Sequence, residues 1–444
     1  MVMRSERTLW MVAIAALAAH ALFIALTYSH AIPTSQDHYD ARQYRELADS
    51  ILAGDGFQLV RKGVKGPDLD RTPVYPLFVA IFGAGWERVP VVIFAQHLLV
   101  LATAYLTWRW ARDRLGPSLA AVAAFAIVAF DLTTMTYASY LLTETLFTFF
   151  LTAAFFLWPA EGVARPNVRA ALSGAAWGLA TLARPITLYL APVAIVLSVV
   201  AALRRREAFS HALVAVVVGV LIVGSWMVRN QEQCGHALLS TIEGENLLYY
   251  RAALVGLPPG KGVDEFRKEL RVETAEGSYD RADPHQAAML DEVKKQKAIH
   301  LMLENPLRLH TPLVLGFPRL LFSPNRSYFY KLLGIDHAEW NLDEIGTQSF
   351  TSKIFSVETL YLGASVLYQT IVLLLALVGA AIGIRRREPW VVVPAVALAY
   401  LIVVSSGLET HARFRVPLVP VLAVLAARAL VAATERFGSH EARR

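Results

Sequence analysis

The chain has 444 residues, of which 55% are hydrophobic and 18% carry a charge, and its mean hydropathy is +0.44. This composition excludes an ordinary soluble globular protein and predicts a membrane protein. The formal net charge is +6, but the arginines lie beside the ends of apolar runs and form no single basic face or tail, so nucleic acid is not an expected partner.

The first apolar run, residues 8–28, follows Arg4 and Arg7 and has the general layout of a signal peptide. It is longer than a usual signal-peptide core, and the stretch "TYSHAIPTSQ" after it contains no convincing small-x-small cleavage site. We therefore expect this run to remain as the first transmembrane helix.

A polar connection, residues 29–90, follows the first run. Within it Tyr44, Leu47, Ala48 and Ile51 recur at helical spacing, as does Leu52, which predicts a short amphipathic helix lying along the membrane surface. Asp40 falls at the start of this helix. A carboxylate in that position either caps the helix or is available for chemistry, and spacing alone does not decide between the two.

Six more apolar windows of roughly the length that spans a bilayer follow, at residues 89–109, 117–131, 141–159, 168–183, 186–203 and 209–228. We group residues 1–228, with the connection 29–90, as an N-terminal transmembrane module. Residues 229–357 form a second polar segment, in which Asp283 is placed to cap a helix and Pro284 lies in its first turn. The single cysteine, Cys234, excludes an internal disulfide.

The last module, residues 358–444, holds three apolar windows at 358–383, 389–406 and 414–433, which brings the expected total to about ten spans in an all-α polytopic membrane protein. Arginines cluster in alternate connections, as the positive-inside rule requires of cytoplasmic loops. These arginines are Arg109, Arg112, Arg114, Arg165, Arg169, Arg204 to Arg206, Arg385 to Arg387, Arg443 and Arg444. Both termini are therefore expected in the cytoplasm, and the segments 29–90 and 229–357 outside.

Seven motifs on the predicted outer side occur in the same order as in a known superfamily. They are "DARQYRELADSILAGDGF", "RTPVYPLFVAIFG", "LLTETLF", "GLATLARPITL", "SWMVRN" with "LSTIEGENLLYY", "IHLMLENPLRL" and "ARFRVPLVP". The series resembles the bacterial GT-C glycosyltransferases, the superfamily of protein O-mannosyltransferases and the lipid A aminoarabinose transferase. The likeness covers most of the chain to about His310 and the last 30 or so residues, whereas 313–407 match by hydropathy only.

The resemblance implies a GT-C-like helix bundle with external juxtamembrane helices in the bacterial inner membrane. It also implies a reaction in which a sugar passes from a polyprenyl-phosphate donor to a hydroxyl of a glycan, lipid or protein acceptor on the outer side. The aminoarabinose branch has an acidic pair and Lys-Pro-Pro, where this chain has alanine after Asp40 and Thr-Pro-Val after Arg71. That substrate is therefore not carried over.

The expected reaction needs a carboxylate near the bilayer surface, because the acceptor hydroxyl must lose its proton as it attacks the anomeric carbon. Asp40 is the leading candidate base, and one base suffices for an inverting displacement because phosphate leaves without a strong acid. Asp37 is an alternative carboxylate and His38 an alternative base of another type. Glu144, in the first turn of the fourth span, either orients an arginine or a metal, or forms a salt bridge that holds the first loop to the bundle.

Arginine at the outer interface is the expected contact for the donor phosphate, because a guanidinium group binds phosphate oxygens through two parallel hydrogen bonds. Four arginines qualify: Arg184, Arg229, Arg413 and Arg415. Each could alternatively anchor a helix at the interface. Arg184 is the leading candidate, because it lies on the outer side against the orientation bias of the other arginines.

Tyr44, Arg71 and Tyr249 are the expected lining of the substrate site. Tyr249, together with Tyr250 and Trp226, could instead belong to the aromatic belt found at any membrane interface. A divalent metal shared by carboxylates stays open, because oxygen ligands spread over distant loops leave no readable spacing.

Three other functions fit the composition: a flippase or transporter of lipid-linked sugars, a polysaccharide polymerase or ligase, and a scaffold without activity. Transporters usually carry polar residues at the membrane midplane and in repeated halves, whereas here the ionisable residues concentrate at the outer rim. A polymerase or ligase differs only in the length of its lipid-linked donor, which the sequence does not show.

Overall fold

The computed structural model describes residues 2–158, 164–190, 206–335 and 357–441. Most of the expected span 186–203, the arginines Arg204, Arg205, Arg443 and Arg444, and the end of the external segment from residue 336 lie outside these ranges. Within them the chain is helical apart from one antiparallel pair of strands, β1 (Gln58–Arg61) and β2 (Val64–Pro67). The predicted all-α class is confirmed.

Five helical segments of the described ranges are long and apolar enough to cross a bilayer. Four belong to α1 (Val2–Asp37), α4 (Val89–Leu115), α10 (Arg206–Cys234) and α18 (Val357–Arg385), and the fifth, Ala412–Glu435, runs through a 3₁₀ turn into α20 (Val419–Glu441). A sixth span is formed if α5 (Leu119–Ala129) and α6 (Leu132–Ala138), bent by 44°, are taken together. The spans expected at 141–159, 168–183 and 389–406 are the shorter helices α7 (Glu144–Leu157), α8 (Pro166–Ala183) and α19 (Pro389–Ser405). A polytopic membrane protein is therefore confirmed.

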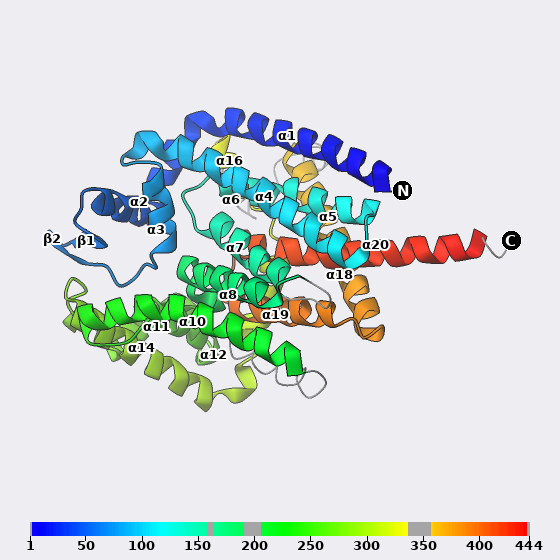
Figure 1. Cartoon of the computed structure of the whole chain (residues 1–444). Coiled ribbons are helices and arrows are strands. Elements are labelled where there is room, and N and C mark those ends of the chain that lie inside the picture. The colour runs from blue at the N-terminus through cyan, green and yellow to red at the C-terminus, as the bar shows by residue number, and fades with distance from the viewer. Residues whose placement is uncertain (1, 159–163, 191–205, 336–356, 442–444) are drawn as a thin grey trace, which may run out of the picture.

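The start of α1 and the end of α20 lie at the same end of the bundle (Figure 1). α1 has 36 residues and is roughly 54 Å long, so it carries the chain to the opposite end. There it leads into α2 (Tyr39–Leu52), α3 (Val74–Ile81) and the β1–β2 hairpin, while η7 (Ala412–Leu418) leads from that end into α20. The topology thus brings the first external loop and the entry to the last span together.

The remaining helices connect these parts, and most belong to the external segment. They are η1 (Trp86–Arg88), η2 (Pro185–Thr187), α11 (Glu243–Leu247), η3 (Leu248–Ala252), α12 (Ala253–Val255), α13 (Val263–Glu273), η4 (Glu276–Ser278), α14 (Pro284–Glu304), η5 (Pro306–Arg308), α15 (Thr311–Phe322) and α16 (Arg326–Leu332). The side chain of Asp283 accepts from the backbone N–H of His285 at 2.9 Å, so the predicted cap of α14 is confirmed. α2 buries Tyr44, Leu47 and Ala48, as its apolar stripe predicts, whereas Leu52 is exposed.

α20 is the central helix of the bundle, and residues 418–427 are buried all round. This burial agrees with its nearly continuous apolar sequence, since a helix that is apolar on every side belongs in a core. α18 packs closely along it at Gly379, where an added Cβ would overlap the carbonyl oxygen of Leu425. The absence of a side chain at Gly379 is therefore a condition for this helix contact.

Gly379→Ala should consequently separate α18 from α20 and lower the thermal unfolding temperature of the detergent-solubilised protein, since overpacking costs about 1–3 kcal/mol. Gly363→Ala, on the same helix, is the matched control: it is exposed and has open space around it. The control should leave the unfolding temperature unchanged or raise it, because alanine favours helix. Equal behaviour of the two variants would contradict the close packing.

Candidate functional site

Asp40 lies in the first turn of α2 but does not cap it, because the N-cap residue is His38, which makes no side-chain capping bond. The capping interpretation of Asp40 is therefore wrong. Its carboxylate instead accepts from two arginines: Arg71 Nη2 lies 2.7 Å from Oδ1, and Arg413 Nη1 lies 3.3 Å from Oδ2. Arg71 comes from the loop before α3, and Arg413 from η7.

Glu144 is the first residue of α7, and its side chain is 2% exposed. Arg184, which follows the last residue of α8, donates from Nη1 to Glu144 Oε1 at 2.6 Å. Arg413 Nε lies 3.9 Å from the same oxygen, so Arg413 stands between the two carboxylates. We call the set Arg71, Asp40, Arg413, Glu144 and Arg184, in which the charges alternate, the acid–arginine cluster.

Phe414 holds two guanidinium groups of this cluster. The Arg413 guanidinium lies 4.9 Å and the Arg184 guanidinium 5.1 Å from the centre of its ring, within the range of cation–π attraction. The side chains of Arg413 and Arg184 are 20% and 16% exposed, whereas Glu144 lies beneath them. Two oriented cations are thus accessible at the end of the bundle, above a buried carboxylate.

Three buried polar atoms beside or within the cluster have no hydrogen-bond partner among the residues that the structure describes: Glu144 Oε2, Arg413 Nε and His38 Nδ1. Buried polar groups in folded proteins are nearly always hydrogen-bonded, and a bound water or ion is one common explanation of an exception. The cluster therefore has capacity for additional polar contacts.

The electrostatics of the cluster are those of an anion site with an ionised acid. Three guanidinium groups face two carboxylates, which leaves a formal charge of +1. Burial raises the pKa of Asp40, but the charges of Arg71 and then Arg413 lower it further, to about 2, so the carboxylate is ionised at neutral pH. Burial lowers the pKa of His38, whose imidazole is therefore neutral.

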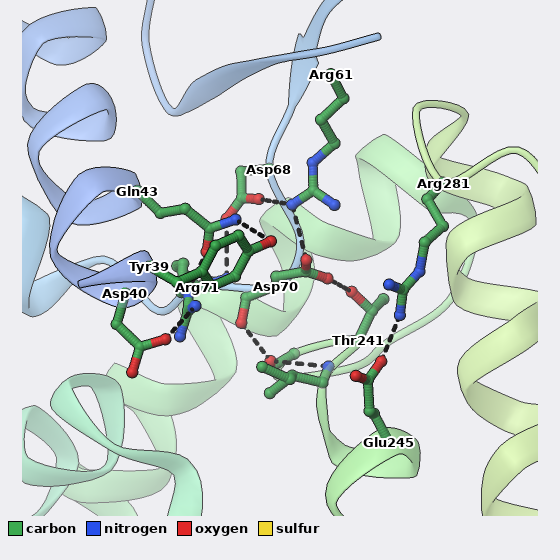
Figure 2. Close-up of polar contacts among 12 residues, drawn as sticks. Tyr39, Asp40, Gln43, Arg61, Asp68, Asp70, Arg71, Thr241, Glu245 and Arg281 are labelled. Atoms are coloured by element: carbon green, nitrogen blue, oxygen red, sulfur yellow. Dashed lines mark hydrogen bonds and ion pairs between the residues drawn. The ribbon is translucent and has the colours of Figure 1, made fainter. Parts of the chain in front are cut away.

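Arg71 is held from several sides, as Figure 2 shows. Its Nε donates to Gln43 Oε1 at 2.7 Å, its guanidinium lies 5.2 Å from the ring centre of Tyr44, and its backbone N–H donates to Asp68 Oδ2 at 2.8 Å. The two predicted lining residues Tyr44 and Arg71 therefore contact each other, and Arg71 contacts Asp40 directly.

A pair of carboxylates beside Arg71 was not expected from the sequence. Arg61 Nη2 donates to Asp68 Oδ1 at 2.5 Å and to Asp70 Oδ2 at 2.8 Å, and Thr241 Oγ1 donates to the other oxygen of Asp70. These contacts join the β1–β2 hairpin and the external segment to the loop that presents Arg71 (Figure 2). The stretch "DLDR", with two acids directly before the motif arginine, was the available signal.

Arg229 and Arg415 are not in the cluster. Arg229 donates to the backbone carbonyls of Asp68 at 2.9 Å and Phe57 at 3.0 Å, and so ties the first external loop to α10. Arg415 is 3% exposed and donates to the backbone carbonyls of Leu320, Leu321 and Ser323 and to the hydroxyl of Thr133. Of the four arginines expected at the donor phosphate, the structure brings Arg184 and Arg413 together with Asp40.

Two other predicted residues also lie apart from the cluster. The hydroxyl of Tyr249 donates to Glu276 at 2.7 Å, and its ring packs under Arg271 and Lys294, in an ion-pair network of the external segment. Asp37 is the last residue of α1 and is exposed. Neither contact set includes a member of the acid–arginine cluster.

A divalent metal does not fit the side chains of the cluster by themselves. In the described ranges no group of three or more His, Cys, Asp or Glu residues has a metal-binding arrangement. The carboxylates of Asp40 and Glu144 already have guanidinium partners, and the surplus positive charge of the cluster opposes the binding of a metal cation. No step is assigned to a metal.

Comparison with solved structures identifies the fold. The archaeal oligosaccharyltransferase AglB from Archaeoglobus fulgidus, in complex with an inhibitory peptide and a dolichol-phosphate, superposes with a TM-score of 0.50 at 12% identity, over 96% of this chain and 51% of that chain. The chain has the GT-C fold. It spans about half the length of the archaeal enzyme. The family resemblance of the seven motifs is thereby confirmed at the level of fold.

Another GT-C structure matches less closely. ArnT from Cupriavidus metallidurans, bound to undecaprenyl phosphate, covers 92% of this chain and 77% of its own at 14% identity, with a TM-score of 0.36. Neither a protein-family model nor a curated protein sequence matches the chain. The likeness of this chain to the archaeal enzyme therefore lies in its fold.

The low pKa of Asp40 predicts a pH-dependent contribution to stability. The pKa is about 2 in the folded protein against 3.8 for the free side chain, which corresponds to about 2 kcal/mol of unfolding free energy above about pH 5. Because the folded-state pKa is depressed, this contribution is lost as the pH falls through 3.8 towards 2. Unfolding of the wild type and Asp40→Asn from pH 7 to 2.5 should show a stability gap that narrows with acid; a gap that widens would contradict the geometry.

Proposed function

We propose that this GT-C protein is an inverting glycosyltransferase that moves a sugar from a polyprenyl-phosphate donor to an acceptor hydroxyl at the outer face of the bacterial inner membrane. The observation that carries the proposal is the contact of the ionised Asp40 with the partly exposed Arg413, which Glu144 links to the partly exposed Arg184 at the same end of the bundle. The GT-C fold supports it. The termini are then cytoplasmic, and the cluster faces out.

Arg184 and Arg413 are the proposed contacts of the donor phosphate. Guanidinium groups bind phosphate oxygens in pairs, and Phe414 orients both of these. The formal charge of +1 on the cluster matches the single negative charge of a sugar–phosphate diester. A diphosphate-linked donor would bring at least two negative charges, so the charge balance favours a monophosphate donor over that of a polymerase or ligase.

Asp40 is the proposed base. The acceptor oxygen attacks the anomeric carbon, its proton passes to Asp40 Oδ2, and the bond between the anomeric carbon and the phosphate oxygen breaks with its electron pair on that oxygen. Attack from the face opposite the phosphate inverts the anomeric centre. Arg413 now contacts this Oδ2; when Arg413 turns to the phosphate, one of the two cations that lower the pKa of Asp40 is withdrawn, and its basicity rises.

Glu144 holds the phosphate-binding arginines in this scheme. It contacts Arg184 at 2.6 Å and Arg413 at 3.9 Å through one oxygen, and it lies below the accessible guanidinium groups. Its role is therefore to orient arginines, whereas neither of these two partners belongs to the first external loop.

The test is transfer of radiolabelled sugar from a polyprenyl-monophosphate donor by protein reconstituted in liposomes. Asp40→Asn should bind the donor but lose transfer by about 10²- to 10⁴-fold, as expected for loss of a general base. Asp55→Asn is the matched control: Asp55 is in the same loop and forms an exposed ion pair with Lys65. It should transfer at the wild-type rate.

Each other outcome removes part of the proposal. Full transfer by Asp40→Asn would contradict the assigned base, and loss in Asp37→Asn alone would move the role to Asp37. Label that crosses the bilayer without covalent transfer would indicate a flippase. Transfer from a diphosphate-linked donor alone would indicate a polymerase or ligase. A wild type that neither binds nor uses any such donor would contradict the function as a whole.

A further inference from the structure

We infer that Gln96, on α4, is a positioning residue. It holds Asp40, the proposed base, in place relative to Glu144 and its partners Arg184 and Arg413, the proposed phosphate contacts. The inference rests on the proposed function for its kinetic consequences, but its structural part does not depend on it. Gln96 is 0% exposed and lies in a helix whose composition is that of a membrane span. A buried amide in such a place needs partners for all of its hydrogen-bonding groups.

The three partners of Gln96 come from both sides of the cluster. Its Oε1 accepts from the hydroxyl of Tyr75 at 2.9 Å, and its Nε2 donates to the backbone carbonyls of Ala138 at 2.9 Å and Tyr140 at 2.8 Å. The orientation of the amide is unambiguous, because the two carbonyls can only accept. Both N–H groups and the oxygen are therefore used, and the side chain is held in one position.

On one side Gln96 supports Asp40 through aromatic rings. Tyr75 is 0% exposed on α3, and its ring meets that of Tyr44 edge to face at 4.8 Å. The guanidinium of Arg71, which binds Asp40, lies over the Tyr44 ring at 5.2 Å. The hydroxyl of Tyr75 thus anchors the stack on which Arg71 and Asp40 rest.

On the other side the two hydrogen bonds of Gln96 Nε2 hold the backbone at the turn that leads into α7. Ala138 is the last residue of α6, residues 139–143 connect it to α7, and Glu144 is the first residue of α7. The next residue on α4 is hydrogen-bonded to the same turn: His97 Nε2 lies 3.0 Å from the hydroxyl of Ser139. Two consecutive residues of α4 therefore fix the turn before α7. This turn sets the position of Glu144 and, through it, the positions of Arg184 and Arg413.

The hydrogen bonds of His97 extend this support to α1. His97 Nδ1 lies 2.7 Å from His20 Nδ1, and His20 Nε2 lies 2.9 Å from the carbonyl oxygen of Ala129. Since a carbonyl only accepts, His20 carries its proton on Nε2, so His97 donates from Nδ1 and accepts from Ser139 at Nε2. This chain fixes the turn but does not reach Tyr75, so Gln96 is the residue in this group of contacts that joins both sides.

The test replaces Gln96 with methionine, which keeps the length of the side chain and removes all three hydrogen bonds. Gln96→Met should lower the transfer rate by roughly 10- to 100-fold, since a displacement of about 1 Å between reacting groups has that effect. Gln369→Met is the matched control. Gln369 is a buried glutamine of α18, and within the described ranges its amide nitrogen bonds only to Ser365, one turn away on the same helix. It should transfer at the wild-type rate.

Tyr75→Phe tests the contact of Gln96 with Tyr75 alone, and it replaces Gln96→Met as the test if that variant does not fold. It removes one hydroxyl and leaves the grip on residues 138–140 intact. Tyr75→Phe should lower kcat several-fold while the affinity for polyprenyl phosphate stays unchanged. Gln96→Met should lower both kcat and this affinity. Wild-type kcat in Tyr75→Phe, or an equal effect of Gln96→Met and Gln369→Met, would overturn the inference.

Hydrogen–deuterium exchange measured by mass spectrometry tests the positioning without any assay of activity. Gln96→Met should raise exchange both in residues 138–144 and in residues 72–78, and Gln369→Met in neither. Unchanged exchange in either segment would overturn the inference. If the wild type proved inactive with every donor, the proposed function would fail, while this exchange result would still decide the role of Gln96.

Discussion

The structure depends on the constraint that charges can be buried at the end of a membrane bundle only in contact with opposite charges. Breaking a buried ion pair typically costs about 3–5 kcal/mol, because the remaining charge is left without a partner. Asp40, Glu144 and the arginines of the cluster satisfy this requirement by alternating. They come from α2, the loop before α3, the start of α7, the end of α8 and η7, so the pairing requires these five segments to meet at one place.

The same pairing leaves the cluster suited to an anion. Arg413 is shared by both carboxylates and stacks on Phe414, and its Nε makes no hydrogen bond to the residues that the structure describes, so it has capacity for a further acceptor. The GT-C fold provides the setting at the end of the bundle opposite the termini (Figure 1). In the proposed function, donor binding would make Asp40 more basic, because Arg413 is both one of the two arginines that lower the pKa of Asp40 and a proposed contact of the phosphate.

Hydropathy, motif order and helical spacing were sufficient for the all-α membrane class, the GT-C fold and the buried stripe of α2. The orientation bias of the arginines favoured Arg184, but nothing in the sequence separated Arg413 from Arg229 and Arg415, because each follows or precedes a span. Only tertiary contacts show that Arg229 and Arg415 bind backbone carbonyls. Gln96 resembles a tolerated polar residue in an apolar run, since its partners lie 21, 42 and 44 positions away. Such long-range pairing leaves no periodic signal.

The affinity of the reconstituted protein for undecaprenyl phosphate, measured for the wild type, Arg413→Gln and Arg229→Gln, tests the central claim most directly. A charge-assisted contact to phosphate is worth about 1.5–3 kcal/mol, so Arg413→Gln should weaken binding by roughly 10- to 100-fold. Arg229→Gln should bind as the wild type does, because its guanidinium holds the carbonyls of Asp68 and Phe57. Wild-type affinity in Arg413→Gln, or an equal loss in Arg229→Gln, would contradict the account.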